Sequence, residues 1–444
     1  MSNALPLPPS PNLEQYKKLA RDLQDACKST AAGAIRRWAE RWVETLARLH
    51  GPVYWPAARG RDADAEEIER RWNRLKENTE HVAKCALGGA QLFIAHEHGF
   101  TNWPKFARHV RELARNNSQV AAFERAADAI VMGNAPTLRQ LLAAHPGLVQ
   151  ERSTREHRST LLHYVSANGV ESYRQKTPKN TVEITNLLLD AGAVVDAESD
   201  AYGGGCTTLG LVATSVHPEK AGVQIALLQT LLDRGANLQH PSAGGNHHSV
   251  VHGCIANGQP AAAKFLADLG APLDLEGAAA LGRLDVLQSY FEESGARRSE
   301  TNPKQIASAF LYACGYGSLN AAKFLLDRGA DPATRDDDDQ TGLHWATWGP
   351  KTDVIKLLLE RGAPVDAKER RFQATPLDVA LWTWDNIPNE EDRERCYEAI
   401  ALLARAGAKL DRDHWRDPGK DGSVMLEKID SDVRMLAALR GDMP

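Results

Sequence analysis

The sequence predicts an all-α protein in which a solenoid of about eight helix pairs follows a small helical domain. Two recurring phrases predict the solenoid, and their absence from the first part of the chain separates the front domain. At 444 residues the chain is longer than one compact core usually supports. We therefore expect a helical domain over 1–116, a solenoid over 121–413 and a C-terminal capping segment over 414–444.

A leucine-rich phrase that closes with glycine and alanine marks the end of each second helix. The copies are Leu187–Ala193, Leu231–Ala236, Leu325–Ala330 and Leu358–Ala363, with weaker ones ending at Gly270, Gly295 and Gly407. Each glycine follows an apolar-periodic helix and stands where a helix C-cap needs a positive φ, which glycine adopts without a Cβ penalty. These glycines therefore predict where the helix pairs end.

A second phrase precedes these helices, in the copies Ser159–His163, Gln340–Ala346 and Ala374–Ala380. Its threonine is expected to cap the first helix of the pair, and Pro376 takes an early helical position. The two phrases resemble the opening and the close of the ankyrin repeat, whose period is about 33 residues. The resemblance implies a stack of helix pairs that presents a concave surface and binds or scaffolds proteins.

The resemblance covers about two thirds of the chain. It predicts units at 121–157, 158–200, 201–243, 244–274, 275–302, 303–335, 336–370 and 371–413. The unit at 275–302 is short and lacks the opening phrase. Segments inserted at 173–180, 201–205, 217–220 and 384–393 are expected to project as loops, because insertions in solenoids usually do.

The front of the chain has helical periodicity without either phrase. The stretch Ala90–Pro104 resembles one found at the front of many bacterial ankyrin proteins, which implies a bacterial type of N-terminal helical domain but no chemistry. The front tryptophans are Trp38, Trp42, Trp55, Trp72 and Trp103. They are expected in a helix-bundle core, with a ligand cage as the alternative.

Composition excludes several classes of function. The net charge of −5 gives no general attraction for nucleic acid or for an anionic membrane. No signal-like or membrane-spanning apolar stretch is found, so the sequence predicts a cytoplasmic protein. The cysteines Cys27, Cys85, Cys206, Cys254, Cys314 and Cys396 form no C-x-x-C pair, which predicts reduced thiols rather than a disulfide framework or a zinc ribbon.

Large aromatic residues stand where the resemblance implies that first helices face the concave groove. They are Tyr316, Trp348 and Trp382. Exposed rings lack a packing reason, and tryptophan and tyrosine are frequent binding hot spots. We therefore expect a protein or peptide ligand at this place.

An acidic turn precedes the seventh unit and contains Asp337 and Asp338. One interpretation is a solvated loop tip. The other is an acidic lip that selects a cationic group by charge and by cation–π contact. Arg370 and Arg371 would partly cancel that charge.

The alternative function is an enzyme or small-molecule receptor with a pocket under the loops inserted at 201–220 and 240–250. Its residues would be Tyr202, Thr207, His217, His247 and His248. Inserted loops with clustered histidines are not needed for a plain stack.

Neither catalytic residues nor a metal or other cofactor is predicted. His163, His252 and His344 share one repeat position, where the imidazole is expected to bond to the adjacent turn and to be part of the scaffold. Zinc held by His248, His252 and Cys254 is the alternative. Cys254 stands where a small buried residue belongs.

Overall fold

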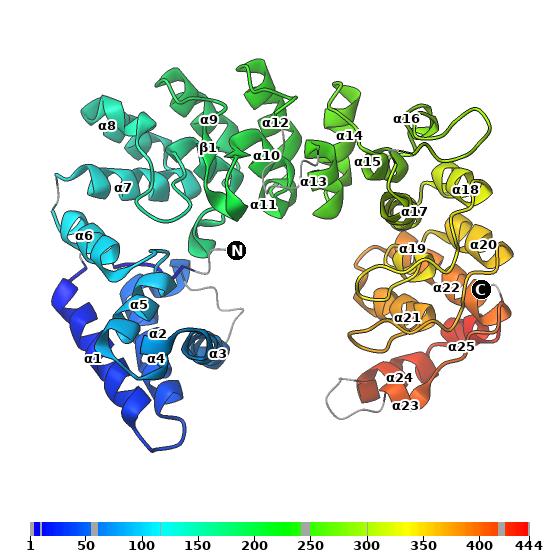
Figure 1. The fold of residues 1–444 in the computed structure, drawn as a ribbon, viewed down its shortest axis with the longest axis horizontal. Coiled ribbons are helices and arrows are strands. Elements are labelled where there is room, and N and C mark those ends of the chain that lie inside the picture. Colours follow the sequence, from blue (N-terminus) through cyan, green and yellow to red (C-terminus); the bar gives the residue numbers. More distant parts are fainter. Residues whose placement is uncertain are drawn as a thin grey trace. The chain divides into compact units, whose positions relative to one another are not determined.

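The computed structural model describes residues 4–8, 11–54, 61–115, 117–240, 249–299, 301–415 and 422–442. Figure 1 shows that these residues are mostly helical, and the predicted all-α class is confirmed. Contacts divide the chain into two compact units, the N-terminal unit Met1–Leu266 and the C-terminal unit Ala267–Pro444. The division falls inside the predicted solenoid, and the predicted domain boundaries stay predictions. No described helix has both the length and the apolar character needed to cross a membrane.

Helices without the repeat phrases form the front of the N-terminal unit. They are α1 (Leu13–Lys28), α2 (Ala34–Tyr54), α3 (Arg61–Asn78), α4 (Glu80–Ala83), α5 (Leu87–Glu97) and α6 (Trp103–Leu113). Trp38, Trp42 and Trp72 are buried in their shared core, and Trp103 packs against it. The predicted core role of these four tryptophans is confirmed, whereas Trp55 lies outside the described residues.

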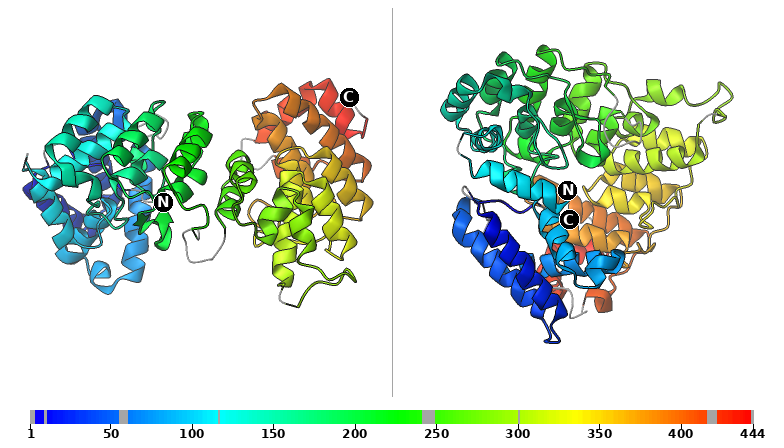
Figure 2. Two further views of the ribbon diagram at one scale, coloured as in Figure 1. Left: turned by 90° about the horizontal axis from the view of Figure 1, so that it is seen from above. Right: turned by 60° about the vertical axis from the view of Figure 1, so that its left-hand side comes forward.

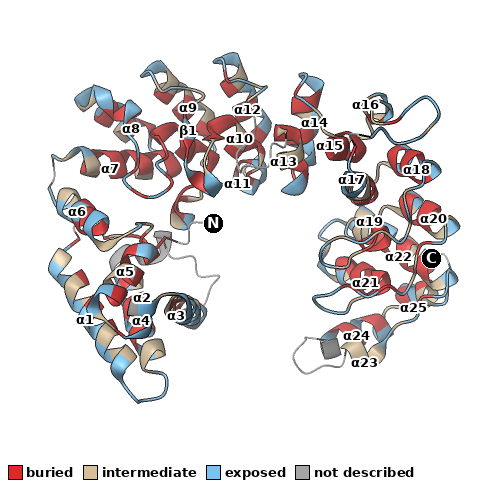
Figure 3. Ribbon diagram, viewed as in Figure 1, coloured by how far each residue is buried: buried red, intermediate tan, exposed pale blue. Residues whose placement is uncertain are grey.

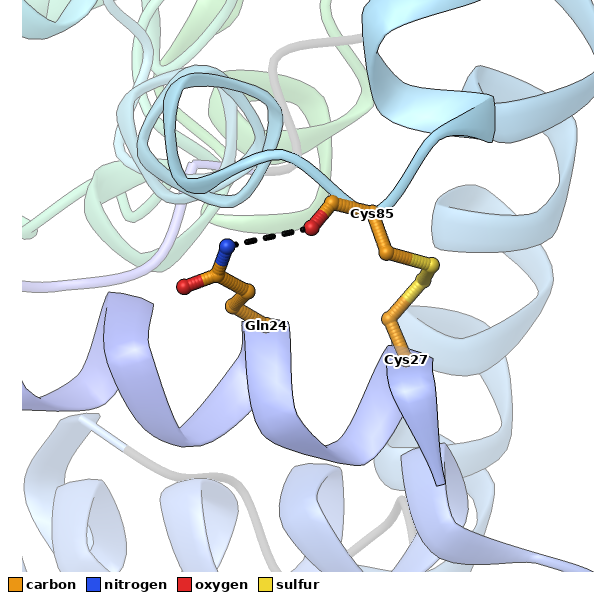
Figure 4. The surroundings of a disulfide bond; sticks show 3 residues. All are labelled: Gln24, Cys27 and Cys85. Atoms are coloured by element: carbon orange, nitrogen blue, oxygen red, sulfur yellow. Dashed lines mark hydrogen bonds between the residues drawn. A yellow bond between two sulfur atoms is a disulfide. The ribbon is translucent and has the colours of Figure 1, made fainter. Parts of the chain in front are cut away.

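A disulfide bond joins two segments of the front helices. Cys27 near the end of α1 bonds to Cys85 in the turn before α5, and Gln24 Nε2 donates to the Cys85 carbonyl oxygen at 3.2 Å (Figure 4). The prediction of reduced thiols is wrong for this pair, because 58 residues separate the two cysteines and only the packing of α1 against α5 brings them together. The remaining cysteines are free and buried: Cys206, Cys254, Cys314 and Cys396.

Helix pairs follow in the N-terminal unit. They are α7 (Gln119–Val131) with α8 (Ala135–Ala144), the 3₁₀ helix η2 (Leu161–Ser166) with α9 (Thr181–Asp190), α10 (Thr208–Ala213) with α12 (Gln224–Asp233), and α13 (Val250–Ala256) with α14 (Pro260–Asp268). Their first helices pack side by side in the order α7, η2, α10, α13, and the second helices α8, α9 and α12 form another layer (Figure 1).

Short elements fill the connections of this unit. They are η1 (Pro146–Gln150), η3 (Ser172–Arg174), η4 (Ala201–Gly203), α11 (Val216–Lys220), and the antiparallel strands β1 (Glu198–Ser199) and β2 (Cys206–Thr207). The inserted residues 217–220 thus become a short helix.

The C-terminal unit holds another four helix pairs. They are α15 (Leu275–Ala280) with α16 (Leu284–Gln288), α17 (Pro303–Tyr316) with α18 (Leu319–Asp327), α19 (Gly342–Thr347) with α20 (Thr352–Glu360), and α21 (Pro376–Asn386) with α22 (Glu390–Arg405). First helices contact first helices and second helices contact second helices along the unit. Figure 2 gives two further views of the pairs, and Figure 3 shows their buried residues where the helices of a unit pack together.

Three helices end the chain: α23 (Arg412–Trp415), α24 (Gly422–Ser431) and α25 (Val433–Leu439). Helix α25 packs on α22, with Met435 and Ala438 buried. The segment therefore covers the last helix pair, as a capping segment would.

The two phrases act at the helix ends as predicted. Thr341 and Thr375 take extended conformations and cap their helices with reciprocal hydrogen bonds to the third helical residue. At the other end, Gly329 has φ +90° and Gly362 has φ +76°. Both helix boundaries of a pair are thus fixed by local backbone chemistry.

Two of the inserted segments do not project as loops, contrary to expectation. In 173–180, Arg174 is buried and forms ion pairs with Glu124 and Asp128, both at 2.8 Å. In 384–393, the first residues extend α21 and the last ones begin α22, with Trp384 buried. Each insertion therefore adds one buried side chain, Arg174 or Trp384, to its unit.

Candidate binding surface

Five aromatic side chains follow one another along the first helices of the C-terminal unit. Tyr312 and Tyr316 lie on α17, Trp345 lies on α19, Trp348 is its C-cap, and Trp382 lies on α21. Ring centroids are 6.5 Å apart for Tyr312 and Tyr316, 5.2 Å for Tyr312 and Trp345, and 5.2 Å for Trp348 and Trp382. We call these five residues the aromatic row.

Exposure differs along the aromatic row. Trp348 is 50% exposed and Trp382 is 47% exposed, whereas Tyr312, Tyr316 and Trp345 are half-buried. The two exposed indoles meet edge to face, with an interplanar angle of 70°. Large apolar rings that remain open to solvent are frequent at binding surfaces, because a core would bury them.

Helix geometry places Trp345 and Trp348 on the same side of α19. Residues three or four apart share a helix face, so Trp345 lies beside Trp348. Leu343 and Ala346 are fully buried on the opposite side of α19. The capping interactions at Thr341 fix where α19 begins, and with it which residues face outward.

The turn at residues 335–340, which we call the acidic turn, is tied to the aromatic row. One carboxylate oxygen of Asp336 accepts from Trp345 Nε1 at 2.9 Å, and the other accepts from the backbone N–H groups of Asp338 and Gln340 at 3.0 and 2.8 Å. The Gln340 side-chain oxygen accepts from Trp348 Nε1 at 3.4 Å. Sequence reasoning did not single out Asp336 and Gln340, because nothing in the sequence shows which residue of an aspartate run turns inward.

Arginines engage only part of the acidic turn. Arg370 pairs with Asp339 at 3.1 Å, and Arg335 donates to the carbonyl oxygens of Asp339 and Lys368 at 3.0 and 3.1 Å. Arg371 lies over the Phe372 ring, 5.0 Å from its centroid.

The predicted acidic residues themselves remain open. Asp337 and Asp338 are exposed, and within the described part of the chain neither carboxylate forms an ion pair. Arg370, which was predicted to cancel part of the acidic charge, therefore pairs with Asp339 and with neither of these two carboxylates.

The N-terminal unit contains a cleft of about 490 Å³ at the alternative site. Its wall includes Tyr202, Thr207 and His217, which the structure brings together, whereas His247 and His248 lie outside the described residues. Among the described lining residues none is Asp, Glu, Lys or Arg. Burial, with a smaller effect of Lys220, lowers the pKa of His217. His240 also lines the cleft, and its Nε2 lies 3.1 Å from a carboxylate oxygen of Glu198.

Most polar groups of this cleft are satisfied within the protein. Tyr202 donates its hydroxyl proton to the Asn168 side-chain oxygen at 2.5 Å, and the Asn168 amide donates to Thr214 Oγ1 at 3.1 Å. Tyr202 has φ +53°, a conformation that residues other than glycine rarely adopt. The same ring lines a second cleft of about 670 Å³, whose wall includes the ion-paired Arg71 and Glu97.

Two of the three repeat-position histidines have the predicted scaffold role. His163 Nδ1 bonds to Thr160 Oγ1 at 2.8 Å and its Nε2 to the Cys206 carbonyl oxygen at 3.1 Å. His344 bonds in the same way to Thr341 and to the Ala374 carbonyl oxygen, at 2.9 and 3.1 Å.

At the third such position, His252 follows the cap Ser249, whose hydroxyl accepts from the His252 backbone N–H at 3.1 Å. Cys254 is fully buried, and its thiol donates to the Ala213 carbonyl oxygen at 3.4 Å. Burial raises the pKa of this thiol to about 12, so Cys254 is protonated and behaves as the predicted small core residue.

Comparison with known proteins identifies the repeats in the C-terminal unit. Residues 275–369 match the family model of ankyrin repeats, in three copies. The matched segment contains Tyr316 and Trp348 and ends before Trp382. Ankyrin repeats are therefore confirmed for this part of the chain, and such repeats generally mediate protein–protein interaction.

Several eukaryotic proteins are similar over short stretches. The chain is 40% identical over 99 residues to serine/threonine-protein kinase 12 of Arabidopsis thaliana, covering 22% of this chain and 19% of the kinase. It is 34% identical over 93 residues to palmitoyltransferase Hip14 of Drosophila melanogaster, covering 21% and 13%. It is 28% identical over 205 residues to ankyrin repeat and KH domain-containing protein mask-1 of Caenorhabditis elegans, covering 45% and 7%. The chain thus spans less than a fifth of each of these relatives.

Among solved structures, the chain is similar to the ankyrin repeat domain of Bcl-3, a member of the IkappaB family. The identity is 18%, the TM-score is 0.29, and the match covers 61% of this chain and 96% of that domain. A score this low supports no conclusion beyond the repeats already identified.

Proposed function

We propose that this chain is a binding module that holds a segment of a partner protein on the aromatic row of the C-terminal unit. Trp348, Trp382 and Tyr316 would make the main contacts, within the concave groove expected of an ankyrin stack. The observation that supports this most directly is the half exposure of two touching indoles on neighbouring first helices. Buried tryptophan and tyrosine contacts supply much of the binding energy in protein interfaces.

The surroundings of the aromatic row also suit an interface. Contacts from Asp336 and Gln340 hold the indole edges of Trp345 and Trp348, so these rings lose little freedom when a partner binds. Exposed polar groups of the acidic turn would form the rim around the apolar centre. No reaction of the chain's own is proposed at this site.

Partner capture tests the proposal. The double variant Trp348→Ala plus Trp382→Ala should lose the partners that the native chain captures, with affinity reduced more than about tenfold for loss of hot-spot residues. Leu269→Ala is the matched control, because Leu269 is 48% exposed, lies in the same unit and is outside the aromatic row. Retention of every captured partner by the double variant would remove the basis for this site.

A second candidate function is a receptor for a small, uncharged polar molecule in the 490 Å³ cleft of the N-terminal unit. The observation that favours it is the convergence of Tyr202, Thr207 and His217 on one wall, whose described residues include no Asp, Glu, Lys or Arg. A thermal-shift screen of neutral sugars, nucleosides and amides with the full chain tests it. A ligand that raises the melting temperature of the native chain, but not of Tyr202→Ala, would support it; absence of any such ligand contradicts it.

The cytoplasmic location remains part of the proposal. The Cys27–Cys85 disulfide weighs against it, because disulfides usually persist in oxidising compartments. The bacterial type of the protein likewise stays a proposal, supported by the front phrase alone.

A further inference from the structure

We infer that the segment bound on the aromatic row is cationic, with a lysine or arginine side chain against the Trp348–Trp382 pair and the acidic turn beside it. This inference rests on the proposed function and adds the chemistry of the partner. It draws on ring geometry, on the carboxylates of the acidic turn and on the contacts of the nearby cationic side chains.

Ring geometry supplies the first argument. The planes of Trp348 and Trp382 are inclined at 70° with centroids 5.2 Å apart, and about half of each side chain faces solvent. The exposed part of each indole is an apolar surface on which a long aliphatic stem can pack. Lysine and arginine place apolar stems on such surfaces, and indole is the strongest cation–π partner among the aromatic side chains.

The acidic turn supplies the second argument. It contains four aspartates and one arginine, and among the ion pairs of the described residues only Asp339 takes part. Asp336 accepts hydrogen bonds from neutral donors, the Trp345 indole and backbone N–H groups. Asp337 and Asp338 are exposed. Within the described residues, none of these three carboxylates forms an ion pair.

The arginine side chains near the aromatic row already form contacts with other groups of the protein. Arg335 is held by two carbonyl oxygens, Arg370 by Asp339, and Arg371 lies over Phe372. Lys351 packs over Gly317 and Gly349 at the ends of α17 and α19. An acidic segment would face like charges on this surface, which disfavours its binding.

Selection from a displayed library of random peptides tests the inference without knowledge of the partner. The full native chain serves as bait, and the Trp348→Ala plus Trp382→Ala variant is used for subtraction. Peptides that depend on the two tryptophans should be enriched in lysine and arginine. If they are neutral or acidic, the cationic inference is overturned and the proposed function stands; if no selected peptide depends on the tryptophans, both fail.

Charge reversal then tests the role of the acidic turn. Affinity of a selected peptide for Asp337→Lys plus Asp338→Lys should fall about tenfold or more at 0.1 M salt, and the difference from native should shrink at 1 M salt. The control is Asp353→Lys plus Glu360→Lys, the same charge change on exposed residues of α20. Equal losses in both variants would show only general attraction and overturn the inference.

A milder pair of substitutions separates binding from folding. Trp348→Phe plus Trp382→Phe keeps apolar rings but weakens the cation–π contact. It should unfold like the native chain and bind the cationic peptide less tightly. Native affinity in this variant would overturn the role assigned to the indoles.

Discussion

Two histidines at the same repeat position, His163 and His344, link neighbouring helix pairs through hydrogen bonds of the neutral imidazole ring. In His163 and His344, one ring nitrogen closes the cap of its own helix and the other reaches the backbone of the next helix pair. Burial lowers the pKa of both imidazoles. The ring therefore links two helix pairs without a charge in the interior.

Acid should destabilise the N-terminal unit through its buried histidines. Burial lowers the pKa of His109 and of His163 to about 4, below the ordinary value of about 6.5. As pH falls below about 6.5, these two histidines bind protons in the unfolded chain, whereas in the folded chain they stay neutral until about pH 4. Stability is then lost across this window, by up to about 3 kcal/mol for each histidine.

Denaturant unfolding followed between pH 7 and pH 4 measures this loss. His109→Gln should give a shallower dependence of unfolding free energy on pH, whereas His96→Gln, on an exposed residue, should match the native slope. An unchanged slope in His109→Gln would contradict the assignment.

At the scale of the element, the sequence predicts what local chemistry determines. Helix ends could be predicted at Thr375 and Gly362 because a cap or a positive φ depends on the residue itself and its immediate neighbours. The exposed places of Trp348 and Trp382 were predicted from the repeat positions that the ankyrin resemblance implies for groove residues, and both side chains are about half exposed.

Long-range pairing could not be predicted. Arg155 bonds to Glu124 and Glu171 at 2.5 and 2.8 Å, and Arg174 joins the same cluster from an inserted segment. Burial alone would raise the pKa of Glu171, but the two guanidinium groups hold it well below its ordinary value. No periodic pattern marks residues that meet only after the chain has folded.

The acidic turn has one feature that could be predicted from the sequence and one that could not. Its charge is evident from composition, but the inward role of Asp336 depends on the turn's backbone, in which Asp339 adopts φ +62°. Only the folded turn shows that Asp336 holds Trp345 while Asp337 and Asp338 remain open.

For the whole molecule, contacts between neighbouring helix pairs dominate. In a stack of this kind each pair packs on the next one, so stability is a sum of local contributions rather than the property of one core. In the N-terminal unit the front helices also contact the chain that follows them. The Glu156 N–H donates to the Gly99 carbonyl oxygen at 3.1 Å, and His109 bonds to Thr154 Oγ1 at 2.7 Å. The stretch Ala90–Pro104 thus supplies, through Gly99, part of the contact between the front helices and the helix pairs that follow.

A core truncation in the C-terminal unit should therefore remain local. Leu358 is fully buried on α20, and Leu358→Ala should cost about 2–5 kcal/mol of unfolding free energy. Hydrogen exchange should accelerate in α17–α22 and stay native in α1–α6, because few contacts transmit the loss along a stack. Leu319→Ala, at a partly exposed position on α18, should change little in either region. Equal acceleration in α1–α6 would mean that the chain unfolds as one cooperative body, and binding on the aromatic row would then depend on the stability of every repeat.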